Sequence, residues 1–339
     1  MADAATRDYW VDYAKAIGIA LVVYGHVIRG VYDAGLSISE GFFLLSDSIV
    51  YSFHMPLFFF LSGLFFFGSF NKRGAKDFLL NKVDTVAYPY FLWSFIQITF
   101  VVVLARFANS PADSGAFWSI LTHPFGQFWF LYALFFFFVA SSIVFFKEFR
   151  FSFILILLFS LAIFLRPLPS NWGILAIFFS SYFCFFLLGA GFKRLTNTHW
   201  LGDLKVTLAL AMAFIVFQGF YHFELNKTFA ERTAWSLALT LVSMLFVVSL
   251  SMCLARKPKK WVLFVGASSM AIYVMHILTG SGIRVILQKI FGIDDVIVHV
   301  LLGFAFGMLV PMLAQYLIDR YKIPLVFSAP ISVLFTSNK

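Results

Sequence analysis

The chain has 339 residues, of which 61% are hydrophobic and only 12% are charged, and its mean hydropathy is +0.91. Soluble globular domains carry about 25% charged residues, so this composition excludes a soluble enzyme or binding module and indicates an integral membrane protein. The formal net charge is +9. That charge follows the pattern of membrane topology described below, so we expect no nucleic-acid partner.

The two cysteines, Cys184 and Cys253, both fall inside apolar segments. Two such residues define neither a disulfide framework nor a metal-binding spacing. We therefore expect them to pack as small hydrophobic side chains, and we expect no metal site.

Apolar runs of about 17 to 25 residues predict membrane-spanning helices. The expected fold is all-α, with about ten transmembrane helices around a polar, histidine-containing cavity and a single domain over residues 1–339, without a separate soluble domain. The fifth helix is short, and the ninth is long and polar enough to be broken. Its TGSG at 279–282 marks either a break or a close helix approach. The ten helices are expected at 9–29, 48–69, 84–105, 128–146, 151–165, 172–192, 204–222, 233–254, 262–290 and 296–318.

With ten spans, both termini lie on one side of the membrane. Of the 25 Lys and Arg residues, seventeen fall on that side, five in the opposite loops and three in the spans. The positive-inside rule then places both termini in the cytoplasm and loops 30–47 and 106–127 outside. No cleavable signal peptide is evident, because the first apolar run is long enough to span. We expect a bacterial inner membrane as the location.

The first span, Tyr9–His26, carries three ionisable residues, Asp12, Lys15 and His26. Lys15 and His26 are eleven residues apart, which is about three helical turns, so they share one helix face roughly 16 Å apart along the axis. Charged and titratable groups inside a membrane are costly unless they line a polar cavity. This face is therefore the first candidate for function.

Depth along the predicted spans brings further polar residues to the same level. At about 1.5 Å per residue, His26, His54 and His276 lie about 21 to 25 Å from the cytoplasmic side, and Arg284 about 12 Å beyond His276. Each histidine could simply bond a neighbouring helix. Metal binding by the three is supported only weakly, since no HExxH or CxxC accompanies them. Three histidines at one depth favour a functional cavity.

Five strings resemble the acyltransferase 3 family of membrane O-acyltransferases, and within it the fucose 4-O-acetylase-like branch. They occur in family order over residues 9–276: DYAKAIGIALVVYGH, FHMPLFFFLSG, AYPYF preceded by a basic loop, FWFLYALFF and SSMAIYVMH. The resemblance implies transfer of an acyl group, usually acetyl from cytoplasmic acetyl-CoA, to a hydroxyl of a surface glycan or lipid-linked sugar on the extracytoplasmic side.

The resemblance also assigns residues. The basic residue and the histidine of the family's first helix fall on Lys15 and His26, although the family usually has Arg at the first position; Lys keeps the charge and loses the bidentate fork. The family's basic loop falls on residues that are candidates for binding CoA phosphates, together with Lys15 and with Ser62 of the second span: Lys72, Arg73, Lys76 and Lys82. Positive-inside topology alone also explains a basic loop.

The chemistry of O-acylation requires a base for the sugar hydroxyl, and neutral histidine serves near pH 7. His26 is the candidate, either as general base or as a residue that is itself acylated and relays the group. His54 and His276 are expected to orient it, bind acceptor or polarise the thioester. Candidates for acceptor binding are Trp129, Tyr132 and Arg284, although an aromatic belt at the membrane interface explains the first two equally well.

A proton-coupled transporter or flippase is the alternative, because broken helices and polar groups near the midplane also suit transport. Against it, the chain has no internal duplication and few intramembrane carboxylates. Membrane lipids are expected neighbours, and a homo-oligomer stays open.

Overall fold

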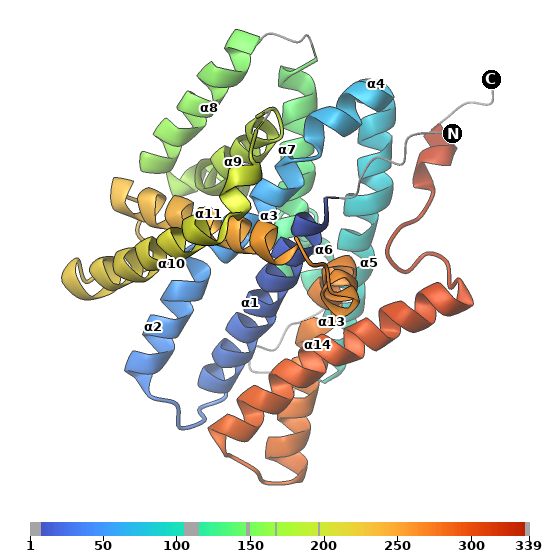
Figure 1. Cartoon of the computed structure of the whole chain (residues 1–339). Coiled ribbons are helices and arrows are strands. Elements are labelled where there is room, and N and C mark those ends of the chain that lie inside the picture. The colour runs from blue at the N-terminus through green and yellow to red at the C-terminus, as the bar shows by residue number, and fades with distance from the viewer. Residues whose placement is uncertain (1–7, 105–114, 147–149, 167, 196, 336–339) are drawn as a thin grey trace.

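A computed structural model describes residues 8–104, 115–146, 150–166, 168–195 and 197–335. Every regular element within those ranges is helical (Figure 1). Residues 1–7 and 336–339 of the predicted tails and 106–114 of the predicted outer loop lie outside the described residues. The long helices and their bounds are α1 Tyr9–Asp33, α2 Glu40–Tyr51, α3 His54–Gly63, α4 Phe66–Lys82, α5 Tyr88–Val103, α7 Trp129–Val144, α8 Arg150–Leu165, α9 Ile174–Phe192, α10 Leu204–Gly219, α11 Ala234–Leu254, α12 Lys260–Ala267, α13 Ser269–Val285 and α14 Val296–Tyr321.

Short helical turns complete the connections. They are α6 Ala116–Ser119, 3-10 turns at Gly126–Phe128, Ser170–Trp172, His199–Gly202 and Ile331–Phe335, and π turns at Val83–Ala87, Phe220–Glu224 and Ile286–Ile290. Within the described ranges, nine helical stretches are long and apolar enough to cross a membrane, and the fifth predicted helix is the shorter α8. The chain is an all-α integral membrane protein.

The predicted outer loop 30–47 is largely helical, because α1 continues to Asp33 and α2 begins at Glu40. We expected a loop there because the segment lies between two predicted spans. Asp47 instead receives two hydrogen bonds from Arg29, at 2.7 and 2.9 Å, which neutralise its charge within the helix pair. The predicted basic loop 70–83 is also helical and belongs to α4, which is kinked at Gly74, where φ is 75°.

The second span is interrupted between α2 and α3, next to the proline of the HMP sequence. Pro56 has no N–H to donate to the carbonyl of Ser52 one turn earlier. The Thr240 hydroxyl of α11 donates to that carbonyl instead, at 2.8 Å. The interruption leaves Tyr51 as the last residue of α2 and His54 as the first residue of α3.

The ninth span is broken, but at Ser268 between α12 and α13, and the TGSG segment is helical. Of the two interpretations of TGSG, the structure supports the close helix approach. A Cβ added to Gly280 would lie 3.3 Å from the carbonyl oxygen of Gly303 on α14.

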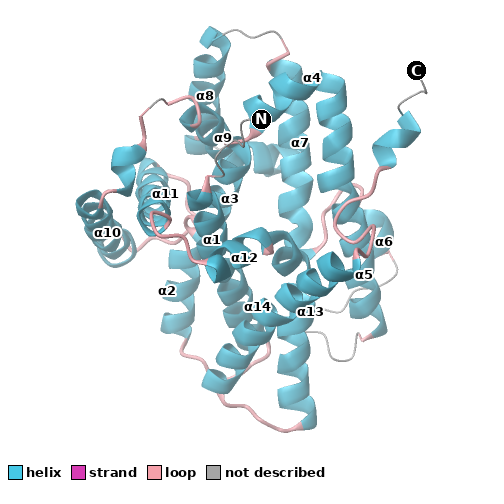
Figure 2. Ribbon diagram, turned by 45° about the vertical axis from the view of Figure 1, so that its right-hand side comes forward, coloured by secondary structure: helices cyan, strands magenta, loops and turns pink. Residues whose placement is uncertain are grey.

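Helix α1 lies at the centre of the bundle, as Figures 1 and 2 show. It packs against α2, α3, α11, α12, α13 and α14. Helices α3 and α9 cross so closely that a Cβ on Gly63 would lie 1.9 Å from the carbonyl oxygen of Phe186. The polar face of α1 is therefore enclosed by helices from both halves of the chain.

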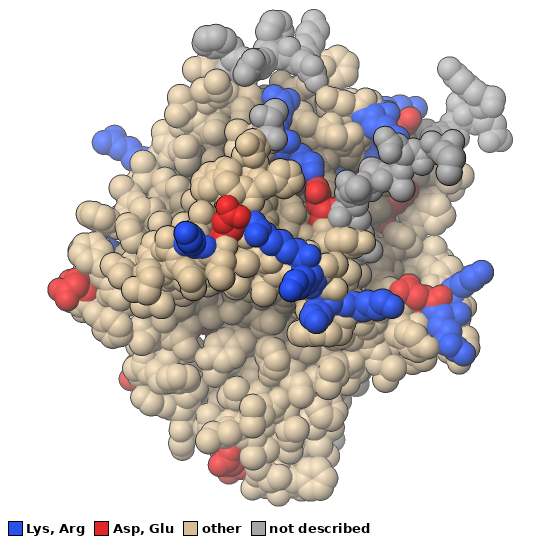
Figure 3. All heavy atoms as spheres, viewed as in Figure 1, with Lys and Arg blue, Asp and Glu red and all other residues tan. Residues whose placement is uncertain are grey.

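The start of α1 and several helix ends form one end of the molecule, here called the N-terminal end. Asp8 is paired with Lys193 after α9, Arg256 after α11 is paired with Asp203, and the Lys259 N–H donates to the Tyr13 hydroxyl at 2.7 Å. On the face shown in Figure 3, a band of Lys and Arg crosses from the α11–α12 connection to the end of α14. The Arg29–Asp47 pair lies at the opposite end of α1.

Candidate active site

Three helices bring the predicted histidines together in the half of the bundle away from the N-terminal end. The rings of His26 on α1 and His276 on α13 lie 4.9 Å apart between centroids. Tyr51 at the end of α2 bridges to the third histidine, with its ring 4.5 Å from His54 and 6.3 Å from His26. We call His26, His54 and His276 the histidine cluster.

Hydrogen bonds fix which tautomer each ring adopts when it is neutral. The Nδ1 atoms lie 3.0 Å from the Val22 carbonyl for His26, 2.8 Å from the Val50 carbonyl for His54, and 2.8 Å from the Tyr273 carbonyl for His276. A carbonyl oxygen has no proton to give, so Nδ1 must carry the hydrogen and donate it. In the neutral ring each Nε2 then keeps a lone pair, which is the requirement for a general base.

Several polar atoms around the cluster are buried without a partner among the described residues: His54 Nε2, His276 Nε2, the Tyr51 hydroxyl and Arg284 Nε. A buried polar atom left unpaired costs about 1–3 kcal/mol. Such atoms gathered at one place indicate a site for a polar ligand.

A cavity of about 260 Å³ leads from the N-terminal end toward the cluster; we call it the inner cavity. Near its entrance it is lined by Lys15, Ser62 and Lys82, three of the residues predicted for donor binding. Its other walls are mostly apolar, with residues such as Phe58, Phe130 and Phe138, and it reaches three residues that adjoin the histidines: Val22, Met55 and Tyr273. Lys15 thus lines the inner cavity, whereas His26 lines a separate, smaller cavity described below.

The remaining predicted basic residues lie elsewhere. Lys72, Arg73 and Lys76 are exposed on α4 and line none of the cavities described here. Lys82, at the end of the same helix, turns inward, with its ammonium 4.3 Å from the centroid of the Phe138 ring. An aromatic face stabilises a cation in an otherwise apolar wall.

Arg284, predicted to bind acceptor, lines a cavity of about 40 Å³ beside His26 and His276. That cavity also contains His299 of α14, which the sequence analysis did not select. His299 is 1% exposed, and its Nε2 lies 2.7 Å from the Ile293 carbonyl. The depth arithmetic applied to the last span would have placed His299 near the same level.

The two aromatic residues predicted for acceptor binding lie away from the histidines. Trp129 packs in an aromatic group with Phe178 and Tyr182, at 5.4 and 5.0 Å between ring centroids. Tyr132 packs against Tyr90 and donates to the Leu121 carbonyl at 3.3 Å. Neither lines the cavities that adjoin the cluster.

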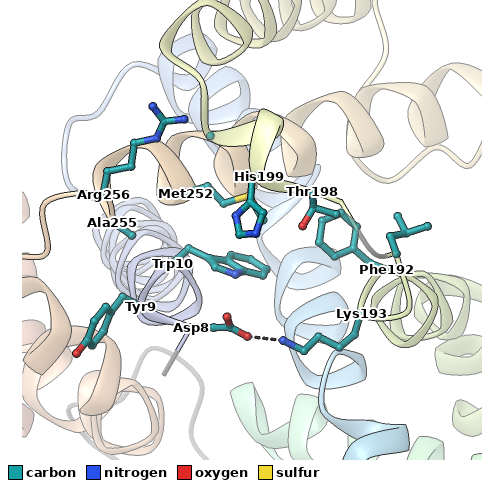
Figure 4. A pocket seen from close by; sticks show the side chains of 12 residues that line it. Asp8, Tyr9, Trp10, Phe192, Lys193, Thr198, His199, Met252, Ala255 and Arg256 are labelled. Carbon is teal, nitrogen blue, oxygen red and sulfur yellow. Dashed lines mark hydrogen bonds and ion pairs between the residues drawn. The ribbon is translucent and has the colours of Figure 1, made fainter. Parts of the chain in front are cut away.

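Another hollow, of about 450 Å³, opens at the N-terminal end beside Trp10 (Figure 4). Trp10 and His199 lie next to each other in it, and Lys193 reaches across to Asp8. It has no residue of the histidine cluster or the inner cavity in its wall. Both of its cations, Lys193 and Arg256, are paired with carboxylates.

No group of three or more His, Cys, Asp or Glu side chains in the described ranges could hold a metal ion. The polar groups at and beside the cluster include three imidazoles, the Tyr51 phenol and the Arg284 guanidinium.

Comparison with known proteins identifies the class to which this arrangement belongs. The family model for the acyltransferase 3 domain matches residues 8–316, which is most of the chain. The chain therefore belongs to the acyltransferase 3 family.

The nodulation protein NolL of Mesorhizobium japonicum is 26% identical over 139 residues, covering 41% of this chain and 36% of that protein. The match thus spans about a third of the length of the curated relative. No solved structure matches the chain.

Proposed function

We propose that this protein is a membrane O-acyltransferase that moves an acyl group, most simply acetyl from acetyl-CoA, to a hydroxyl of a cell-surface or lipid-linked sugar. The observation that carries the proposal is the position of the histidine cluster, which adjoins the lysine-lined inner cavity through Val22, Met55 and Tyr273. Family membership supports the class of reaction. The sugar acceptor rests on the resemblance to the fucose 4-O-acetylase-like branch.

The inner cavity fits the donor. Its apolar walls suit the pantetheine arm, while Lys15 and Lys82 offer positive charge to the phosphates of CoA. An acyl thioester that enters at the N-terminal end would bring its carbonyl to Val22, Met55 and Tyr273, next to the histidines. This direction of entry agrees with the proposed topology, in which both termini are cytoplasmic in a bacterial inner membrane.

His26 is the proposed general base. Its Nε2 takes the proton of the acceptor hydroxyl while the hydroxyl oxygen attacks the thioester carbonyl carbon. The carbon–sulfur bond then breaks, and the CoA thiolate leaves with the proton from His26, so the products are the ester and CoA. His54 and His276 orient the reacting groups or polarise the carbonyl. In the relay alternative, His26 itself becomes acylated before the acceptor arrives.

The first experiment asks whether purified full-length protein in nanodiscs uses acetyl-CoA. A slow hydrolysis of acetyl-CoA, with release of CoA measured by a thiol reagent, is expected even without an acceptor. Neither a transporter nor a flippase predicts this release. Absence of both CoA binding and thioester cleavage would contradict the proposed function.

A further inference from the structure

A second cavity adjoins the histidine cluster on the side away from the donor. We call it the outer cavity; its volume is about 180 Å³, and α2, α3, α9, α11 and loop 225–233 form its walls. The cavity beside Arg284 has only about 40 Å³. One water needs about 10–15 Å³ of such space, so the smaller cavity holds a few waters and the outer cavity holds a group of the size of a sugar ring.

Tyr51 is the wall that the outer cavity shares with the histidine cluster. It lines the cavity, and its ring lies between the cavity and His54, at 4.5 Å from the imidazole. A Cβ on Gly25, the residue before His26, would lie 3.0 Å from the Tyr51 ring, so this ring packs directly on α1. Its hydroxyl is buried and has no partner among the described residues.

The Tyr51 ring is held in place from the opposite side. The Arg29 guanidinium lies 3.4 Å from the ring centroid, and its Nε and Nη2 donate to the two carboxylate oxygens of Asp47. The Ser48 hydroxyl accepts from the Phe229 N–H at 2.8 Å, which fixes loop 225–233 against α2. With Arg29 over one face and Gly25 of α1 against its hydroxyl end, the ring presents its hydroxyl in one position.

The remaining walls combine aromatic faces with polar groups. Tyr182 and Phe229 supply aromatic faces, and Arg232 donates to the Ser180 hydroxyl at 3.1 Å. Glu231 is bonded to Lys227, which lowers the pKa of Glu231, so this carboxylate is ionised at neutral pH. Sugars present apolar C–H faces and a rim of hydroxyls, which aromatic walls with a few fixed polar groups bind.

We propose that the outer cavity binds the sugar ring of the acceptor. Arg232 binds hydroxyl groups at the rim of the sugar. The Tyr51 hydroxyl binds the sugar next to the oxygen that His26 deprotonates. This inference rests on the proposed function. It makes Tyr51 and Arg232 acceptor-binding residues, in addition to the histidines. The donor and the acceptor then approach the cluster from opposite sides.

The test measures CoA release by full-length protein in nanodiscs with acetyl-CoA, before and after addition of methyl glycosides as probes: methyl α-L-fucopyranoside, methyl β-D-glucopyranoside and methyl 2-acetamido-2-deoxy-β-D-glucopyranoside. At least one probe is expected to accelerate release and to become acetylated.

Tyr51→Phe keeps the packed ring and removes only the hydroxyl. It should lower kcat/KM for the active glycoside about five- to tenfold, as expected for one lost hydrogen bond. Arg232→Gln should raise the KM for the glycoside. The KM of Arg232→Lys should lie between that of Arg232→Gln and that of the wild type.

Two matched controls separate the site from its surroundings. Tyr24→Phe changes a half-buried tyrosine of α1 outside the outer cavity, and Arg166→Gln changes an exposed arginine; both should behave as wild type. Hydrolysis of acetyl-CoA without acceleration by any of the three glycosides would overturn the acceptor site and leave the proposed function standing. Glycoside kinetics unchanged in Tyr51→Phe and Arg232→Gln but lost in Arg284→Gln would also overturn it, in favour of the smaller cavity. If the wild-type protein does not hydrolyse acetyl-CoA in the absence of an acceptor, this result would count against the proposed function itself.

Discussion

Lys82 reaches the inner cavity from the last turn of α4, and its ammonium lies 5.1 and 4.3 Å from the ring centroids of Phe78 and Phe138. Lys82 and Lys15 are the two lysines in the largely apolar wall of this cavity. A phosphate oxygen of CoA bound there would make a charge-assisted hydrogen bond, which is among the stronger polar contacts in proteins.

Lys82→Gln is therefore expected to raise the KM for acetyl-CoA about tenfold or more, with a smaller change in kcat at saturating donor. Lys76→Gln on the exposed part of α4 is the control and should have a smaller effect. The measurement is CoA release as a function of acetyl-CoA concentration. Equal KM values for the two variants would remove Lys82 from the donor site.

His54 and His276 are 0% and 2% exposed, and each has an unpaired Nε2. If they orient or polarise substrates, His54→Ala and His276→Ala should each reduce acyl transfer less than His26→Ala does, because the base remains. Transfer of radiolabelled acetyl to the active glycoside measures this order. A larger loss in either variant, in protein that stays folded, would move the role of base to that histidine.

At the scale of helices, the crossing of α3 and α9 holds His54 and Tyr182 in place. Glycines make the crossing, since a Cβ on Gly189 would lie 1.9 Å from the Phe60 carbonyl oxygen, the same distance as for Gly63 and Phe186. Backbone atoms cannot move aside as a side chain can, so the helices must separate when either glycine is enlarged.

Gly63→Ala and Gly189→Ala are expected to destabilise the folded protein by about 1–3 kcal/mol each, the usual cost of overpacking. Gly68→Ala on α4, where a Cβ meets nothing within 4 Å, is the control and should be neutral or slightly stabilising. The midpoint of thermal unfolding in detergent is measured with a fluorogenic thiol reagent, which reacts with the buried Cys184 when the protein unfolds. Unchanged midpoints in both crossing variants would contradict the tight contact.

The sequence predicted the helices themselves better than their interruptions. Apolar length identifies a span because the bilayer fixes it. The break at Ser268 has no Pro or Gly at the break itself. Close to it, Gly266 packs so tightly on α1 that an added Cβ would lie 2.1 Å from the Asp12 carbonyl oxygen. Contacts between distant segments decide such positions, and a single sequence does not show them.

At the scale of the whole molecule, the charged ends define its orientation. Lys257, Lys259 and Lys260 are exposed at the N-terminal end, together with Arg256. By the positive-inside rule this end should face the cytoplasm. Gly35, in the turn between α1 and α2, should face outward.

Single cysteines at Lys257 and at Gly41, in a background without Cys184 and Cys253, test this orientation in intact cells. An impermeant thiol reagent should label Gly41→Cys and should label Lys257→Cys only after the membrane is opened. Labelling of Lys257→Cys in intact cells would invert the topology and the direction of donor entry.

For the site, helical rise predicted that His26, His54 and His276 lie at one depth. The structure adds that His26 contacts His276 and that Tyr51 bridges to His54. Helical rise did not predict Tyr51, which lies one residue before the interruption of the second span, or Arg232, which lies in a loop. Trp129 and Tyr132 were selected for their type, and packing with other aromatic side chains determines where they lie.

The most direct test of the account is His26→Ala in purified, folded protein. Loss of a positioned general base costs about 10²–10⁴ in rate, while the donor cavity one turn away is untouched. The account predicts unchanged CoA affinity and no detectable transfer; an acyl group on His26 of the wild type, found by mass spectrometry with donor alone, would mark the relay form of the mechanism. Near-normal acyl transfer by His26→Ala would contradict the central claim.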